Sequence, residues 1–367
     1  MEKLRFGIVG AGGRPRAFLD AFERSGRAVL VAVCDKNKDA MAEAVAGLDG
    51  VAQYTDYGAM LEDAGLDAVI VGTPMPLHVP QSIAALEKGI HVFSEVMAAV
   101  SVEECRALLE ACRRSSAQYM MGENCCYFRA NMIARELVRS GALGEPFYAE
   151  GEYNHDCRSL ITATPWRKTW LYDVPGVTYG SHALGPILSW LDGDRVTQVL
   201  CVGSGDGLPT LDGEPLTQQA GYTMLCRTVK GRLIKLRQNL SSPRPYGLNY
   251  KLEGSRGAFI SCVAGTEHRD EVWLQGISAE QKWDRLTERE ADYLPELWRR
   301  YAPQVAGEGH GDADVITMID FINALADGRR VPIDIYASLD MTLPGLIGQA
   351  SVRQGSVWLD VPDPREW

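Results

Sequence analysis

Short, uninterrupted apolar runs alternate with helical patterns over the first third of the chain. The runs are residues 4–9, 28–34, 68–72, 90–93 and 118–121, and helical spacing predicts helices at 14–25, 40–46, 80–88 and 102–114. The last of these helices carries two capping signals, Ser101 as N-cap and Glu104 three residues later. Uninterrupted runs indicate strands buried on both faces, and strand–helix alternation is typical of a parallel, doubly wound sheet.

The pattern changes near Gly122. A helix at 130–140 closes at Gly141, and longer runs of alternating character follow at 146–154, 196–202, 222–228, 233–238 and 251–262. Such alternation is typical of an antiparallel sheet that buries one face. Helices predicted at 312–327 and 336–354 complete the chain. We therefore predict an α/β protein of two domains: residues 1–122 form a doubly wound parallel sheet, and residues 123–367 form an α+β domain with an open, mostly antiparallel sheet.

Composition restricts the partners that the chain can have. It has 367 residues, of which 46% are hydrophobic, and a formal net charge of −11. This charge argues against nucleic acid or an anionic membrane surface as a partner, and no stretch approaches the roughly 20 apolar residues of a membrane span. The nine cysteines form no CxxC pair. Since the N-terminus also shows no secretory pattern, we expect a cytoplasmic protein with reduced thiols and no metal site.

A glycine-rich turn follows the first predicted strand. The run at 6–9 leads into Gly10-Ala11-Gly12-Gly13-Arg14-Pro15 and then into a helix. Gly10 permits a tight turn, and Gly12 lets the backbone approach a pyrophosphate at the helix N-terminus. The third glycine of the usual pattern would fall at Pro15, so the motif is incomplete. The second strand ends at Asp35, where a carboxylate meets the ribose of adenosine. The order of these features predicts a dinucleotide, and Asp35 favours NAD over NADP because it repels a ribose phosphate.

Two further strand ends carry polar residues at the same edge. The third strand leads into Gly72-Thr73-Pro74-Met75-Pro76-Leu77-His78, a stiff loop suited to hold the nicotinamide ribose. An alternative is that the prolines only shape a turn and that His78 is structural. The fourth strand leads to Glu95, which Val96 follows.

Four segments together resemble the glucose–fructose oxidoreductase/inositol dehydrogenase (Gfo/Idh/MocA) superfamily: GIVGAGG at 7–13, VCD at 33–35, GTPMPLH at 72–78 and EKGIHVFSE at 87–95. The resemblance implies an N-terminal NAD(P)-binding Rossmann domain, a substrate-binding and oligomerisation domain, a sugar or polyol substrate, and a homo-dimer or tetramer. On this basis the predicted cofactor-binding residues are Gly10, Gly12, Gly13, Arg14, Asp35, Thr73, Pro74, His78, Glu95 and Asn124.

The chain departs from that family at two positions. The family's strand commonly ends in Glu-Lys-Pro, and the lysine handles the proton in its dehydrogenases, whereas this chain has Glu95-Val96-Met97. Valine cannot transfer a proton. The family's catalytic segment typically has an aspartate four residues before its histidine, and this chain has Thr178 before His182. Of the family's lysine, aspartate and histidine, this chain therefore retains the histidine, His182.

Other motifs resemble one branch, the NAD-dependent glycoside hydrolases of the bacterial α-N-acetylgalactosaminidase type. They are GENCCY at 122–127, GEYNHDCR at 151–158, TPWRKTW at 164–170, TYGSHALGP at 178–186 and GHG at 309–311. The resemblance implies that the catalytic residues facing the sugar and nicotinamide are Glu123, Tyr153, Tyr179 and His182. The predicted substrate-binding residues are His155, Arg158, Trp166, Arg167 and His310.

The residue types fit proton transfer and sugar binding. Histidine exchanges protons near neutral pH, and Tyr179 lies three residues before His182, on the same side of a helical turn. Tyr153 and His155 share one face of a strand end, and indole rings such as Trp166 offer platforms for sugars. The alternatives are structural: the pair at 179 and 182 fills a helix start, Glu123 makes an interdomain hydrogen bond, and the tryptophans pack the domain.

The function predicted from these residues is a redox-assisted glycosidase. NAD would take hydride from a sugar ring carbon, a base would remove the neighbouring proton, the leaving group would depart by elimination, water would add, and the hydride would return. An alternative is a sugar or polyol dehydrogenase that releases NADH. A second alternative is an NAD-binding sensor that has lost its activity, although the polar residues at 123, 153, 155, 179 and 182 argue against a dead site.

Overall fold

The structure, a computed structural model, describes residues 2–191, 193–301 and 311–367. Its internal contacts divide the chain into two compact units. The first unit contains the chain up to Asn124, together with Leu297–Leu339 and Pro364–Trp367, and the second contains Cys125–Glu296 and Asp340–Asp363. The chain first leaves the first unit two residues after the predicted boundary at 122. Among the described residues, no helix is long and apolar enough to cross a membrane.

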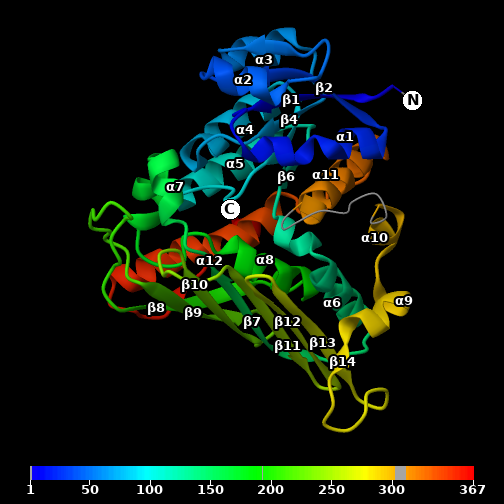
Figure 1. Cartoon of the computed structure of the whole chain (residues 1–367), viewed down its shortest axis with the longest axis vertical. Helices are drawn as coiled ribbons and strands as arrows, with labels where there is room; N and C mark the ends of the chain where they lie inside the picture. The colour runs from blue at the N-terminus through cyan, green and yellow to red at the C-terminus, as the bar shows by residue number, and fades with distance from the viewer. Residues whose placement is uncertain (1, 192, 302–310) are drawn as a thin grey trace. The chain divides into compact units, whose positions relative to one another are not determined.

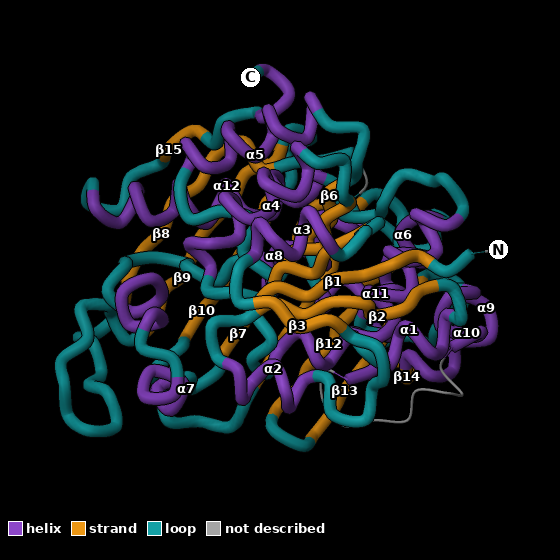
Figure 2. Tube along the Cα trace, turned by 90° about the horizontal axis from the view of Figure 1, so that it is seen from above, coloured by secondary structure: helices purple, strands orange, loops and turns teal. Residues whose placement is uncertain are grey.

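The first unit is built on a six-stranded parallel sheet of order β3-β2-β1-β4-β5-β6 (Figures 1 and 2). The strands are β1 (Leu4–Val9), β2 (Ala28–Cys34), β3 (Ala52–Tyr54), β4 (Ala68–Val71), β5 (His91–Ser94) and β6 (Tyr119–Met121). The predicted doubly wound parallel sheet is confirmed. Edge strand β3 was not predicted because it has three residues, none of them buried.

The helices of the first unit include α1 (Asp20–Ser25), α2 (Lys38–Ala44), α3 (Tyr57–Asp63), α4 (His78–Glu87), α5 (Val102–Arg114) and α11 (Gly311–Ala326). The predicted cap of α5 is present, since Ser101 Oγ accepts a 3.1 Å hydrogen bond from the Glu104 amide. The helix predicted at 14–25 is interrupted: residues Arg14–Phe18 form the 3-10 helix η1, and α1 begins at Asp20.

Helix α11 belongs to the core of the first unit although it lies far along the chain. The ring of Phe321 lies 6.1 Å from Phe6 in β1 and 5.4 Å from Phe93 in β5. All three rings are fully buried. A segment near the C-terminal end of the sequence therefore packs against the sheet, and it brings its own polar residues with it.

The second unit contains a nine-stranded sheet of order β14-β13-β12-β11-β7-β10-β9-β8-β15. The bounds are β7 (Pro146–Asn154), β8 (Val196–Ser204), β9 (Gly221–Thr228), β10 (Leu233–Asn239), β11 (Gly247–Gly254), β12 (Gly257–Ala264), β13 (Glu267–Leu274), β14 (Asp284–Arg285) and β15 (Leu359–Asp360). The β7–β10 pair is parallel and the other neighbours are antiparallel. The predicted mostly antiparallel sheet is confirmed, and the predicted run at 251–262 is the hairpin of β11 and β12.

Helix α8 (Ser181–Trp190) packs closely on this sheet because Gly151 in β7 has no side chain. A Cβ atom at Gly151 would lie 2.1 Å from the carbonyl oxygen of Ala183. The indole of Trp190 donates to the backbone oxygen of Asn131 in helix α6 (Arg129–Arg139), and the Tyr250 hydroxyl in β11 donates to the backbone oxygen of His182. The start of α8 is thus held beside the end of β7. The remaining helices are α7 (Arg158–Ala163), α9 (Glu290–Tyr293), α10 (Glu296–Tyr301) and α12 (Ile335–Arg353).

Candidate active site

The glycine-rich turn after β1 has the geometry of a phosphate cradle. Gly10 has φ +87° and lies against the next loop, since a Cβ atom there would be 2.7 Å from the backbone nitrogen of Thr73. A Cβ atom at Gly12 or Gly13 would meet nothing within 4 Å. Gly10 therefore closes the turn, while Gly12 and Gly13 leave open space beside the backbone, as an approaching pyrophosphate requires.

Asp35 lies at the end of β2 beside this turn. Its Oδ2 accepts a 2.7 Å hydrogen bond from the Ala11 amide, and its Oδ1 accepts one of 2.8 Å from the Asn37 amide. The carboxylate is therefore fixed next to the glycine loop, where the adenosine ribose lies in a dinucleotide-binding sheet. The cradle and the placed carboxylate together fit a bound NAD.

The loop after β4 is tied to the segment after β5 through His78. The buried imidazole lies 2.8 Å from the Thr73 carbonyl oxygen and 2.9 Å from that of Met97. Burial lowers the pKa of His78, and the backbone oxygens partly oppose this. The Thr73 hydroxyl donates to the side chain of Gln81. In this structure His78 and Thr73 hold the loop, and direct contact of Thr73, Pro74 or His78 with the cofactor stays a prediction.

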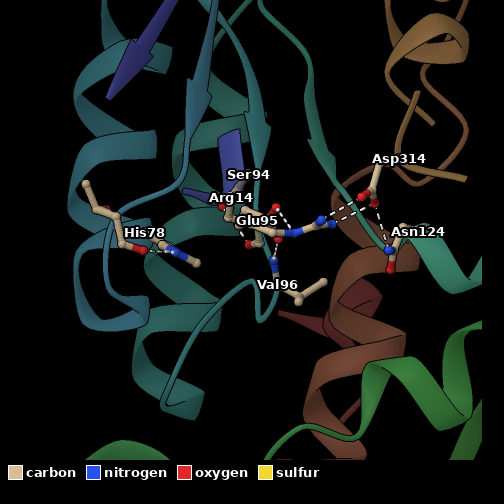
Figure 3. Close-up of polar contacts among 8 residues, drawn as sticks. Arg14, His78, Ser94, Glu95, Val96, Asn124 and Asp314 are labelled. Atoms are coloured by element: carbon tan, nitrogen blue, oxygen red, sulfur yellow. Dashed lines mark hydrogen bonds and ion pairs between the residues drawn. The ribbon is translucent and has the colours of Figure 1, made fainter. Parts of the chain in front are cut away.

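Arg14 forms a charged group with two carboxylates at the carboxyl edge of this sheet (Figure 3). Its Nε lies 3.0 Å from Glu95, and its two terminal nitrogens donate to Asp314 at 2.5 and 2.6 Å. The Asn124 amide donates to the same Asp314 at 2.8 Å. The structure thus brings together three predicted residues, Arg14, Glu95 and Asn124. Asp314 was not predicted as a site residue from the sequence. The feature that could have indicated it is an acidic residue within the apolar helical pattern of 312–327.

In the second unit, five rings form a compact group that we call the ring cluster: Tyr153, His155, Tyr179, His182 and Tyr246. Tyr153 stacks on Tyr179 at 5.9 Å and meets His182 edge-on at 5.0 Å. The Tyr179 and His182 rings are 4.8 Å apart. The Tyr153 hydroxyl lies 3.1 Å from Nδ1 of His155, and Tyr246 meets His155 at 5.1 Å. The four predicted members are therefore neighbours. Tyr246 also belongs to the cluster but was not predicted, because it lies in a loop without a helical or strand pattern.

Position 178 has a structural role in this chain. The Thr178 hydroxyl donates to the Leu171 carbonyl oxygen and accepts from the buried side chain of Gln238 in β10. The Gln238 oxygen in turn accepts a 2.8 Å hydrogen bond from the Tyr179 amide. Threonine and glutamine thus fix the turn that carries Tyr179 into the ring cluster.

Burial shifts the pKa values of two members of the ring cluster, Tyr153 and His155. It raises the pKa of Tyr153 well above its usual value, and nearby thiol and phenol groups add to the rise. Burial also lowers the pKa of His155, with Asp156 opposing and His182 adding to the effect. His155 is therefore neutral at neutral pH, and its Nδ1 can accept the Tyr153 proton.

The predicted substrate-binding residues have varied surroundings. Arg158 is held by Asp156 through hydrogen bonds of 2.9 and 2.8 Å and also reaches the Pro209 carbonyl oxygen. The Arg167 guanidinium lies over the Trp166 ring at 4.6 Å and donates to Thr164. Their contacts with a substrate stay predictions.

His310 lies outside the described residues. Glu123, the remaining predicted catalytic residue, is fully buried just after β6 in the first unit.

Comparisons with known proteins agree with both units. Residues 4–123 match the model of the oxidoreductase family with an NAD-binding Rossmann fold, and residues 218–366 match the C-terminal domain of glycosyl hydrolase 109. A glycosyl hydrolase family 109 protein of Streptomyces filamentosus is 29% identical over 98% of this chain and 77% of its own. An alpha-N-acetylgalactosaminidase of Shewanella oneidensis is 28% identical over 99% of this chain and 85% of its own.

Solved structures share the fold. An NAD-binding oxidoreductase from Klebsiella pneumoniae has a TM-score of 0.81 at 20% identity, covering 98% of this chain and 99% of that chain. A levoglucosan dehydrogenase in complex with NADH has a TM-score of 0.78 at 20% identity, covering 99% of this chain and 100% of that chain.

Proposed function

We infer that this chain, a member of the Gfo/Idh/MocA superfamily with a glycosyl hydrolase 109 C-terminal domain, is an NAD-dependent enzyme that acts on sugars. We propose that it cleaves a glycoside without net oxidation. The observation that carries this proposal is the ring cluster, in which the proposed proton-transfer groups are Tyr153, His155, Tyr179 and His182. Val96, where ordinary relatives have a lysine, offers none.

A bound NAD, which Gly10, Gly12 and Asp35 would hold, would supply reversible hydride chemistry at a sugar ring carbon. The chain's own residues move protons. Tyr153 passes its hydroxyl proton to Nδ1 of His155 as it takes one from the sugar, so that the phenol is never left as a buried anion. The pair of Tyr179 and His182 serves as the second acid–base group, which removes the proton next to the new ketone. Glu123, a buried carboxyl, completes the proposed catalytic set.

Substrate contacts are proposed for His155, Arg158, Trp166, Arg167 and His310. Trp166 offers an apolar ring face, and Arg167 lies over it with hydrogen-bond donors. Such a pair suits the hydroxyl groups and apolar C–H faces of a carbohydrate. The proposed substrate class is therefore a glycoside or free sugar, with NAD favoured over NADP because of Asp35.

Aglycone release tests the proposal. The purified protein is incubated with a panel of aryl glycosides while aglycone and NADH are followed together. Aglycone release with no net NADH supports hydrolysis. Steady NADH accumulation with free sugars, and no aglycone, would establish the second candidate, a sugar or polyol dehydrogenase, which the same ring cluster could serve. Tight NAD binding with neither activity would favour a sensor.

We also propose that the protein is a cytoplasmic homo-oligomer, a dimer or tetramer. Most of the nine cysteine side chains are buried, and their spacing predicts no disulfide framework, as expected in a reducing compartment. Light scattering on the purified protein measures its mass, and a monomer would contradict the oligomer.

A further inference from the structure

Asp314 is a buried carboxylate whose partners come from the carboxyl edge of the parallel sheet. Its side chain is 1% exposed. It receives two hydrogen bonds from Arg14, which follows β1, and one from Asn124, which follows β6 (Figure 3). Burial of a charge in this way is costly unless it is paired, and the bidentate guanidinium supplies the pair.

The position of this group relative to a bound dinucleotide follows from the sheet order. The adenosine half lies over β1 and β2, where Asp35 marks the ribose, so the nicotinamide half lies toward β4, β5 and β6. Glu95 and Asn124 follow β5 and β6 directly. Asp314 therefore lies with them on the nicotinamide side.

Charge at this place affects the two redox forms of the cofactor differently. The nicotinamide ring of NAD+ is a cation, while that of NADH is neutral. Arg14 is paired with two carboxylates, Glu95 and Asp314, so the three side chains together carry a formal charge of −1. This charge favours the cationic ring, and in a protein interior such an effect is weakly screened. Without Asp314, the remaining pair of Arg14 and Glu95 is neutral and the preference is lost. Val96, buried beside Glu95, adds no charge.

We propose that the Asp314 carboxylate biases the bound cofactor toward NAD+. The proposal rests on the proposed function, because an enzyme that borrows and returns a hydride must begin each cycle with oxidised cofactor. Asp314 acts through Arg14 and through its field, so it is a positioning and tuning residue rather than a catalytic one.

The test compares the dissociation constants of NAD+ and NADH for cofactor-free protein by calorimetry. In Asp314→Asn, the preference for NAD+ over NADH falls about tenfold. For this two-electron couple, that equals about a 30 mV rise in the potential of the bound cofactor. The matched control is Asp327→Asn, because Asp327 pairs with Arg27 just after the other end of the same helix. The control leaves the ratio unchanged.

An equal loss of affinity for both forms in Asp314→Asn would overturn the proposal, because it would show a purely structural role. If that variant does not fold, Val96→Lys gives the second measurement, since it adds a cation beside Glu95 and must also shift the ratio toward NADH. An unchanged ratio in the lysine variant would overturn the proposal as well. Neither binding measurement requires glycoside cleavage. The proposal for Asp314 and the proposed glycosidase function can therefore be contradicted independently of each other.

Discussion

The hydroxyl of Tyr153 and Nδ1 of His155 lie 3.1 Å apart, on two residues that share one face at the end of β7. Burial shifts their pKa values in opposite senses, since it favours the neutral phenol and the neutral imidazole. The pair is therefore a neutral donor and a neutral acceptor at rest. A proton that enters through Tyr153 leaves the positive charge on His155, whose side chain is half-buried, and the buried phenol of Tyr153 stays neutral.

Removal of the Tyr153 hydroxyl tests its role in proton transfer. Tyr153→Phe keeps the ring contacts with Tyr179 and His182 and removes the hydrogen bond to His155. We expect turnover to fall about 100-fold or more, while the melting temperature stays close to that of the native chain. The control is Tyr148→Phe, which removes a hydroxyl bonded to Glu150 on the other face of the same strand. Equal turnover in both variants would exclude Tyr153 from the chemistry.

Alanine substitutions at Gly10 and Gly12 are expected to have different effects, the first on stability and the second on NAD affinity. Gly10→Ala places a Cβ atom 2.7 Å from the next loop at a positive φ, so the free energy of unfolding should fall by about 2 kcal/mol or more. Gly12→Ala meets no protein atom, so stability should change little while NAD affinity falls. Urea denaturation and NAD titration of both variants measure this. Unchanged NAD affinity in Gly12→Ala would mean that the pyrophosphate does not lie there.

Cofactor choice depends on Asp35. In Asp35→Asn, the side chain can still accept from the Ala11 amide but no longer repels a 2′-phosphate. We expect the affinity for NADP to rise about tenfold relative to NAD. Asp39→Asn, an exposed change in the following helix, should leave the ratio unaltered. The ratio of dissociation constants in the two variants is the measurement, and equal ratios would remove Asp35 from the specificity determinants.

Stability should fall as the pH falls below neutral. Burial lowers the pKa values of His78, His91 and His155 in the folded protein. The unfolded chain therefore binds more protons below its histidine pKa of about 6.5, and the free energy of unfolding decreases as pH drops through that value toward the folded pKa values. Urea denaturation at pH 7.5 and 5.5 measures the difference. His78→Gln should weaken the dependence, and a variant with the full dependence of the native chain would contradict this assignment.

The local patterns of the chain carry much of this architecture. Uninterrupted apolar runs predict β1, β2, β4, β5 and β6 because strands covered on both faces need apolar residues at every position. The two-residue period of a strand is also enough to predict that Tyr153 and His155 share one face. Strand β3 was missed because its residues are exposed or half-buried and leave no apolar run.

Long-range contacts could not be predicted in this way. Asp314 meets Arg14 across 300 residues of chain, and no periodicity in either segment points to the other. Tyr246 follows two prolines in a loop, where no repeating pattern exists, and it joins the ring cluster only because β11 returns beside β7. These contacts arise from tertiary packing alone.

The most direct test of glycoside cleavage by transient oxidation is the fate of the hydrogen next to the oxidised carbon. The protein is allowed to hydrolyse a reactive aryl glycoside in D2O, and the released sugar is analysed by NMR and mass spectrometry. The proposed cycle removes that hydrogen and replaces it from solvent, so the product should carry one deuterium at C2. A released sugar with its original hydrogen at C2 would contradict the proposed mechanism.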